Sequence, residues 1–231
     1  EVLPLPQRRK ASRDGTQLLG ITKLHSVNSM KPKAVIFDLD GTLLDSFETA
    51  YRAFAQILKE RGAKPPTKTE YRKRYWGRFA GDNYREALGV KGKELKKLLE
   101  KHVKESVKLS KLLRPNPYAR RVLSRLKLRG IKVALVTSTL RRITLSHLEA
   151  MGLSKHFDVV ICGDDVNERK PNPEPLLEAC RELGAKPSDC IYVGDLEVDE
   201  RAARRAGMGK FIRIKRKRDL LKLLGMIDGE N

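Results

Sequence analysis

The segment Lys33-Ala-Val-Ile-Phe-Asp-Leu-Asp-Gly-Thr42 decides how this chain of 231 residues folds. Its four consecutive apolar residues, 34–37, are typical of a buried strand, and two aspartates separated by one residue follow at once. A run that is apolar throughout, without alternation, indicates a parallel strand covered on both faces. We therefore expect this strand to lie inside an α/β sheet, with a polar site at its carboxyl end.

Further short apolar runs follow along the chain, and helical patterns separate them. The runs cover residues 131–136, 159–162, 190–193 and 211–214. Apolar side chains recur at helical spacing within residues 118–126, 140–151 and 176–183. Strands that alternate with helices predict a Rossmann-like, doubly wound parallel sheet with helices on both faces.

The interval between the first two strands is too long for a single crossover. A βαβ unit takes about 30 residues, whereas the chain from Asp38 to Val136 is roughly three times as long. Helical patterns at residues 47–60, 69–76 and 93–111 fill the surplus. Asp45 or Ser46 is placed to cap the first of these helices. We expect an α/β core of residues 30–46 and 114–231, with a small all-helical cap of residues 47–113 inserted in it.

Residues 1–29 differ from the rest of the chain. They hold two of its three glutamines, show no hydrophobic periodicity and end just before Met30. They lack the continuous apolar stretch of a secretory signal. We interpret them as a disordered leader or a non-native extension and leave them out of the fold.

Polar residues follow four of the strands. Asp38 and Asp40 follow the first, Thr137 and Ser138 the second, Lys170 lies beyond the third, and Asp195 ends the fourth with Asp199 four residues later. Because the carboxyl ends of parallel strands meet at one edge of an open sheet, we expect these side chains to converge on one crevice. Residues two apart in extended chain project to the same side, so Asp38 and Asp40 should face one pocket.

The residue types in this crevice indicate phosphate chemistry. Asp38, Asp40 and Asp195 would repel one another and an anionic substrate unless a divalent cation lay among them, and carboxylate oxygens with room for water suit Mg²⁺. A hydroxyl from Thr137 and a positive charge from Lys170 are what the equatorial oxygens of a transferring phosphoryl group need.

These four blocks, in this order, resemble the haloacid dehalogenase superfamily. The resemblance covers about residues 33–214, and its most specific part is the strand followed by Asp-x-Asp-Gly-Thr at residues 38–42. It points to the phosphatase branch with a helical cap, the group of phosphoglycolate phosphatases and β-phosphoglucomutases. It implies a Mg²⁺-dependent phosphatase that hydrolyses small phosphorylated metabolites.

The resemblance also implies catalytic roles. Asp38 would attack phosphorus and form an aspartyl-phosphate. Asp40 would protonate the leaving alcohol and then activate the water that hydrolyses the intermediate. Thr137 and Lys170 would bind the phosphoryl oxygens, with Ser138 as a further contact.

Metal ligands and a contact to the leaving group are implied in the same way. Asp38, Asp195 and the backbone carbonyl of Asp40 would hold Mg²⁺. Asp199 would act through water or by orienting its neighbours, or it could be no more than a cap for its helix. Arg78, in the cap segment Tyr75-Trp-Gly-Arg-Phe79, would contact the substrate.

The net charge of +20 leaves other functions open. Residues 64–114 alone hold 16 Lys or Arg against 6 Asp or Glu. Such an excess is typical of a thermophile's helix surface, of a funnel for anionic substrates or of a nucleic-acid binder. An aromatic content of 6%, with no repeated stacking platform, disfavours nucleic acid. The alternatives are a phosphomutase of the same family and a basic nucleic-acid-binding module with weak phosphatase activity.

The remaining residue types give no second metal site. The cysteines, Cys162, Cys180 and Cys190, form no CxxC pair, which favours a reduced, cytoplasmic protein. The histidines His102, His147 and His156 share no ligand spacing, and we interpret them as structural, with His147 a hydrogen-bonded core histidine. No apolar stretch approaches the roughly 20 residues that span a bilayer. We expect a monomer or homodimer without a membrane partner.

Overall fold

The computed structural model of the chain describes residues 31–228. The interpretation of residues 1–29 as a leader therefore falls on residues outside the described part of the chain, and it stays a prediction.

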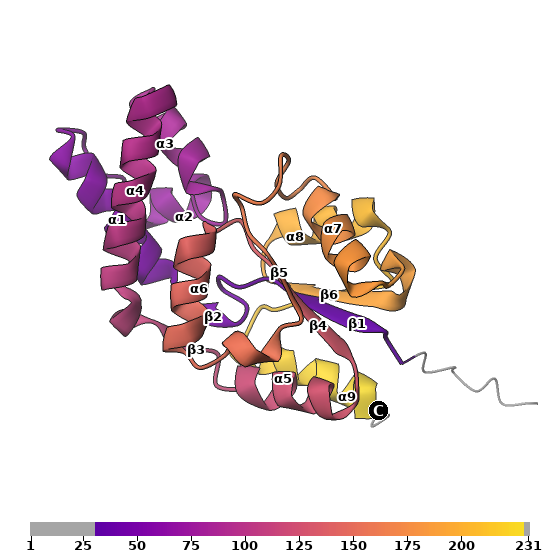
Figure 1. Ribbon diagram of the computed structural model, residues 1–231. Coiled ribbons are helices and arrows are strands. Elements are labelled where there is room, and N and C mark those ends of the chain that lie inside the picture. Colours follow the sequence, from indigo (N-terminus) through magenta and orange to yellow (C-terminus); the bar gives the residue numbers. More distant parts are fainter. Residues whose placement is uncertain (1–30, 229–231) are drawn as a thin grey trace, which may run out of the picture. The chain divides into compact units, whose positions relative to one another are not determined.

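A five-stranded parallel sheet forms the core (Figure 1). Its strands are β1 (Ala34–Phe37), β4 (Lys132–Val136), β5 (Val159–Ile161), β6 (Cys190–Gly194) and β7 (Lys210–Arg213). They lie in the order β5-β4-β1-β6-β7, and all neighbours are parallel. Along the chain, β4 and β5 are added on one side of β1, and β6 and β7 are then added on its other side. Ligands bind at such a reversal point in open α/β sheets, so the end of β1 is where a site is expected.

Helices cover both faces of this sheet, as the apolar runs predict. They are α5 (Ala119–Leu128), α6 (Arg141–Ala150), α7 (Glu174–Leu183), α8 (Glu197–Ala206) and α9 (Lys222–Asp228). Alternate residues of β1 serve opposite faces: Val35 and Phe37 belong to the apolar cluster with α5 and α9, whereas Ala34 and Ile36 belong to the cluster with α7 and α8 (Figure 1). Burying one large apolar side chain is worth about 1.5–3 kcal/mol, so the two clusters hold the strand in place. The α/β class and the doubly wound sheet are confirmed.

Four helices lie in the sequence between β1 and α5: α1 (Phe47–Glu60), α2 (Lys68–Arg74), α3 (Ala80–Leu88) and α4 (Gly92–Lys108). We call them the helical insert. They share an apolar cluster of their own, in which Phe54 stacks on Tyr84 and contacts Tyr71 and Tyr75. The strands β2 (Leu44–Asp45) and β3 (Arg114–Pro115) form a short antiparallel pair. This pair holds the segment that enters the insert beside the segment that leaves it. The division into a core and a cap domain at residues 47 and 113 stays a prediction.

The helical insert packs against the core at the carboxyl edge of the sheet. Phe79 and Val103 of the insert form a small apolar cluster with Leu140 and Ile143 at the start of α6. The guanidinium of Arg169 lies 3.9 Å from the centre of the Phe79 ring. Leu140 and Ile143 of this cluster also line the pocket that contains Asp38, at the end of β1.

The remaining described elements are short 3-10 turns at Ser110–Leu112, Ser154–His156, Pro187–Asp189 and Lys217–Leu221. Within residues 31–228, no helix has both the length and the apolar character that crossing a membrane requires.

Candidate active site

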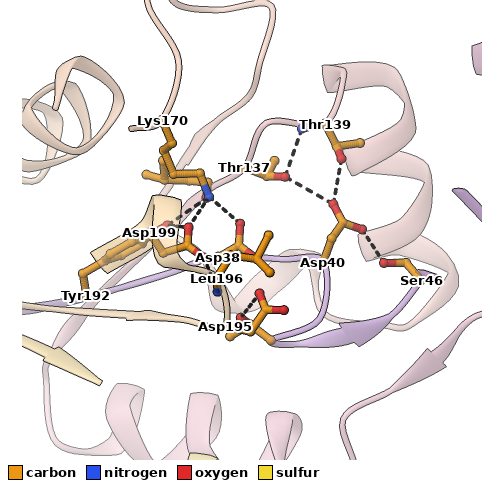
Figure 2. Close-up of polar contacts among 12 residues, drawn as sticks. Asp38, Asp40, Ser46, Thr137, Thr139, Lys170, Tyr192, Asp195, Leu196 and Asp199 are labelled. Carbon is orange, nitrogen blue, oxygen red and sulfur yellow. Dashed lines mark hydrogen bonds and ion pairs between the residues drawn. The ribbon is translucent and has the colours of Figure 1, made fainter. Parts of the chain in front are cut away.

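A buried ion pair lies at the end of the central strand. Asp38 follows β1 directly and is 5% exposed. Lys170, from the segment between β5 and α7, donates from its Nζ to Asp38 Oδ1 at 2.6 Å (Figure 2). Although the two residues are 132 positions apart in the sequence, the structure brings them together. Taking both charges out of water is costly, and their pairing offsets that cost.

Asp199 is the second carboxylate on this lysine. Its Oδ1 accepts from Lys170 Nζ at 2.7 Å and from the Tyr192 hydroxyl at 2.8 Å, and its Oδ2 accepts from the backbone N–H of Leu196 at 3.0 Å. The last bond caps the start of α8. Burial lowers the pKa of Lys170, but Asp199 and Asp38 outweigh it, so the pKa is raised and the ammonium stays charged. Asp199 thus caps its helix and also orients Lys170.

Three carboxylates come close enough together to hold a metal ion. One oxygen each from Asp38, Asp195 and Asp199 lies within 4.8 Å of the others. Burial raises the pKa of Asp195 to about 7, and the charge of Asp199 adds to the shift. A divalent cation among these oxygens would offset the crowding of negative charge, and hard carboxylate donors are what Mg²⁺ or Ca²⁺ takes. The donor set therefore fits such an ion.

Gly41 makes this approach of Asp195 possible. Its φ of +89° lies in the left-handed region, and a Cβ built on it would stand 2.3 Å from Asp195 Oδ2. Any side chain at position 41 would push the Asp195 carboxylate away.

The Asp40 carboxylate points away from the metal cluster and is held by hydroxyl groups. It accepts from Ser46 Oγ at 2.5 Å, from Thr139 Oγ1 at 2.7 Å and, over a longer 3.4 Å, from Thr137 Oγ1 (Figure 2). Among the residues predicted to hold a metal, Asp40 could therefore take part only through its backbone. The hydroxyls fix its carboxylate in one orientation.

Two of the hydroxyl groups that bind Asp40, those of Ser46 and Thr139, were not expected from the sequence to do so. Ser46 is the N-cap residue of α1, but its side chain makes no capping bond because its hydroxyl donates to Asp40. Thr139 was not predicted at all. Thr139 stands two residues after Thr137. The argument that places Asp38 and Asp40 on one side of an extended chain, applied to Thr137, would have predicted Thr139 as a site residue.

One pocket between core and insert contains the predicted residues at the ends of β1 and β4. Its lining includes Asp38, Asp40, Thr137, Ser138, Lys170, Asp199 and Arg78. The Arg78 side chain is already paired: its Nη1 donates to Glu86 Oε2 at 2.6 Å and to the backbone carbonyl of Arg74 at 2.8 Å. Asp195 lies beside this pocket, in the metal cluster with Asp38.

The prediction for His147 is wrong in one respect. The residue is buried, at 4% exposure, but neither ring nitrogen makes a hydrogen bond of normal geometry within the described residues. The reason is its position, because the side chain lines the pocket between core and insert. His102, which lines the same pocket, differs in that its Nδ1 lies 3.0 Å from the Tyr84 hydroxyl.

Comparison with known proteins gives consistent results. Residues 35–213 match the family described as haloacid dehalogenase-like hydrolase. The chain is 33% identical over 180 residues to the phosphoglycolate phosphatase of Aquifex aeolicus, which covers 76% of this chain and 81% of the relative. It is 36% identical over 183 residues to the phosphorylated carbohydrates phosphatase of Thermotoga maritima, with 76% and 82% covered.

A solved structure shows the same fold. The crystal structure of CbbY from Rhodobacter sphaeroides in complex with phosphate is 25% identical, with a TM-score of 0.72. The similarity covers 79% of this chain and 87% of that one. The matched residues 35–213 include the helical insert and, except for Ala34, the whole sheet.

Proposed function

Since this chain belongs to the haloacid dehalogenase-like hydrolase family, we propose that it is a Mg²⁺-dependent phosphatase of small phosphorylated metabolites that works through an aspartyl-phosphate. The observation that carries the proposal is the end of β1. There, Asp38 accepts a hydrogen bond from Lys170, and its carboxylate lies close enough to that of Asp195 for both to hold one metal ion. Asp40, two residues further along the chain, lines the same pocket. Both relatives named above are called phosphatases.

Asp38 is the proposed nucleophile. Lys170 holds its Oδ1, so its other oxygen is the one free to attack phosphorus. The new bond joins a carboxylate oxygen of Asp38 to phosphorus as the bond to the leaving oxygen breaks, and the covalent intermediate divides one difficult step into two. Lys170, kept charged by Asp199, stabilises the negative charge on the phosphoryl oxygens.

Asp40 is the proposed general acid and base. It gives a proton to the leaving alcohol oxygen and later takes one from the water that attacks the aspartyl-phosphate. The Ser46 and Thr139 hydroxyls keep its carboxylate facing the pocket. Thr137 and Ser138 follow β4 beside it and would donate to phosphoryl oxygens.

The proposed Mg²⁺ ligands are Asp38, Asp195 and the backbone carbonyl of Asp40. Asp199 lies in the same carboxylate cluster and orients Lys170. Bound there, Mg²⁺ supplies positive charge that lets an anionic phosphate enter a pocket walled by carboxylates. Arg78 lines the pocket from the insert and keeps N–H groups beyond its bonds to Glu86 and Arg74, which suits a contact to the leaving group.

The proposal is tested by phosphate release from an aryl phosphate. We expect turnover with Mg²⁺, loss of turnover with EDTA and recovery when excess Mg²⁺ is added, because the carboxylate cluster needs a cation before a phosphate can approach. The Asp38→Asn variant, purified identically, measures contaminating phosphatase. Full turnover in metal-free buffer would contradict the metal assignment.

The same assay separates a phosphomutase from a phosphatase. A mutase returns the phosphoryl group to a sugar phosphate, so it would isomerise its substrate, need a trace of sugar bisphosphate and release little free phosphate. Net, stoichiometric phosphate release without a bisphosphate supports the phosphatase.

A further inference from the structure

The pocket has a second group of polar side chains, beyond those expected to meet the phosphate. Asn83 on α3 and His147 on α6 both line it and are 3% and 4% exposed. Neither is fully hydrogen-bonded within the described residues: Asn83 Oδ1 lacks a partner, and neither ring nitrogen of His147 has one of normal geometry, although the Ser106 backbone lies near the ring. Buried polar atoms without partners are uncommon in native proteins, and each calls for a ligand or another explanation.

The bonding of Asn83 decides which of its atoms is free. Its Nδ2 donates to the backbone carbonyl of Tyr75 at 3.0 Å, and this bond distinguishes the two ends of the amide. Oδ1 is therefore an acceptor without a donor. A ligand that satisfies it must bring an O–H or N–H group.

His147 adds a neutral donor and acceptor on the opposite, core side of the pocket. Burial lowers its pKa, although the Asp40 carboxylate and the nearby Ser106 backbone act in the opposite direction. Burial also lowers the pKa of the neighbouring His102, to about 4. Both rings are thus neutral near pH 7, and a neutral imidazole offers one donor and one acceptor.

Each positive charge in the described lining of the pocket already has an anionic partner. Among the described residues that line the pocket, the Lys and Arg side chains are Lys170 and Arg78. Lys170 is paired with Asp38 and Asp199, and Arg78 with Glu86. A second anionic group on the substrate would find both cations of the described lining already paired, and it would compete with Glu86 for the N–H groups of Arg78.

We propose that Asn83 and His147 bind hydroxyl groups of a neutral leaving group, so that the enzyme prefers phosphates of polyols or sugars to phosphates that carry a carboxylate. This inference rests on the proposed phosphatase function. A hydroxyl donates to Asn83 Oδ1 and pairs with a ring nitrogen of His147. A carboxylate has only acceptors, and it would face Asn83 Oδ1 without a donor between them. The preference runs against simple transfer of the name phosphoglycolate phosphatase from the Aquifex relative.

The first test compares substrates of the full chain with Mg²⁺. We measure kcat/KM for glycerol 1-phosphate, 2-phosphoglycolate and an aryl phosphate. The polyol phosphate should exceed phosphoglycolate by about tenfold or more, the effect of one unmatched buried hydrogen bond. A phosphoglycolate value equal to or above that of the polyol overturns the subsite while leaving the phosphatase proposal intact. If the aryl phosphate is not hydrolysed either, the proposed function fails, and the inference with it.

The second test removes the two side chains singly. Asn83→Ala and His147→Phe should each lower kcat/KM for glycerol 1-phosphate by about tenfold and change aryl phosphate turnover by less than about threefold. His156→Phe is the matched control, because His156 is also buried and has no hydrogen-bond partner among residues 31–228, but it lies outside the pocket. Equal losses on both substrates, or losses as large in the control, would assign the two residues to packing and overturn the subsite.

Discussion

Lys170 holds two carboxylates at once, and this shared pairing decides how substitutions at the site should behave. Asp38 and Asp199 lie 2.6 and 2.7 Å from its Nζ, and all three side chains are buried. Losing one carboxylate leaves the lysine with the other. Losing the lysine leaves two buried carboxylates with no cation between them, which is far more costly.

The Asp38→Asn variant should therefore fold and lack activity. Turnover should fall by at least about a thousandfold, because an amide is no nucleophile. Lys170→Met should instead lower the free energy of unfolding by about 3–5 kcal/mol. Urea denaturation of both variants beside phosphate release checks the pair. An active Asp38→Asn enzyme would rule out covalent catalysis through this residue.

Thr139 is expected to position Asp40 without touching the phosphate. Thr139→Val keeps the shape but removes the hydroxyl 2.7 Å from Asp40 Oδ2. Losing one such hydrogen bond should lower kcat by about five- to tenfold while KM changes by less than about twofold. Thr139→Ser restores the hydroxyl and should restore kcat. A change in KM alone would instead make Thr139 a substrate contact.

At the scale of elements, the turn after β1 depends on a glycine for two separate reasons. Gly41 and Gly62 both have positive φ, at +89° and +71°. A Cβ at Gly41 would meet Asp195 at 2.3 Å, whereas a Cβ at Gly62, after α1, would meet nothing within 4 Å. The two positions separate backbone strain from steric exclusion.

Gly62→Ala should lower the free energy of unfolding by about 1–2 kcal/mol, the cost of the left-handed backbone alone. Gly41→Ala should cost about 1–3 kcal/mol more, because Asp195 must move. It should also abolish Mg²⁺-dependent turnover, since the carboxylate cluster loses its geometry. Equal stabilities and full activity in both variants would show that position 41 tolerates a side chain.

At the scale of the whole molecule, many of the basic side chains behind the net charge of +20 lie on exposed helix surfaces. Among the described residues they are not combined with exposed stacked rings, as they would be in a site for single-stranded nucleic acid. The lysines of α4 at positions 93, 96, 97, 101, 104 and 108 are exposed. Of the aromatic residues of the insert, Tyr71, Tyr75 and Tyr84 are buried, whereas Phe47, Tyr51 and Trp76 are partly exposed and pack against the same apolar cluster. Binding by charge alone, without rings on which bases can stack, is sensitive to salt.

We therefore expect oligonucleotide binding to be weak and electrostatic. A single-stranded oligonucleotide bound at 50 mM salt should be released by about 200 mM, and Asp38→Asn should bind it as well as the unaltered chain does. Fluorescence anisotropy over a salt series measures this. Retention at 300 mM salt with base preference would support the nucleic-acid-binding alternative.

How much of this could be predicted differs between fold and site. The sheet and the α/β class follow from short apolar runs separated by helical periods, because both faces of a parallel sheet are buried. Asp38, Asp40, Thr137 and Lys170 could be chosen from their places after strands, since parallel strands end at one edge. Local periodicity did not indicate α3, α9 or the β2–β3 pair, which are short and depend on contacts with distant segments.

The sequence by itself thus determined which backbone segments form the sheet and which polar residues stand at its carboxyl edge. Only the tertiary structure decided what each side chain binds. Asp199 accepts a hydrogen bond from Lys170, and the Ser46 hydroxyl donates to Asp40 instead of capping α1. His147 lines a pocket in which, within the described part of the chain, its ring makes no hydrogen bond of normal geometry. Backbone patterns arise from neighbours along the chain, whereas a polar side chain bonds to whichever donor or acceptor the fold brings within about 3 Å.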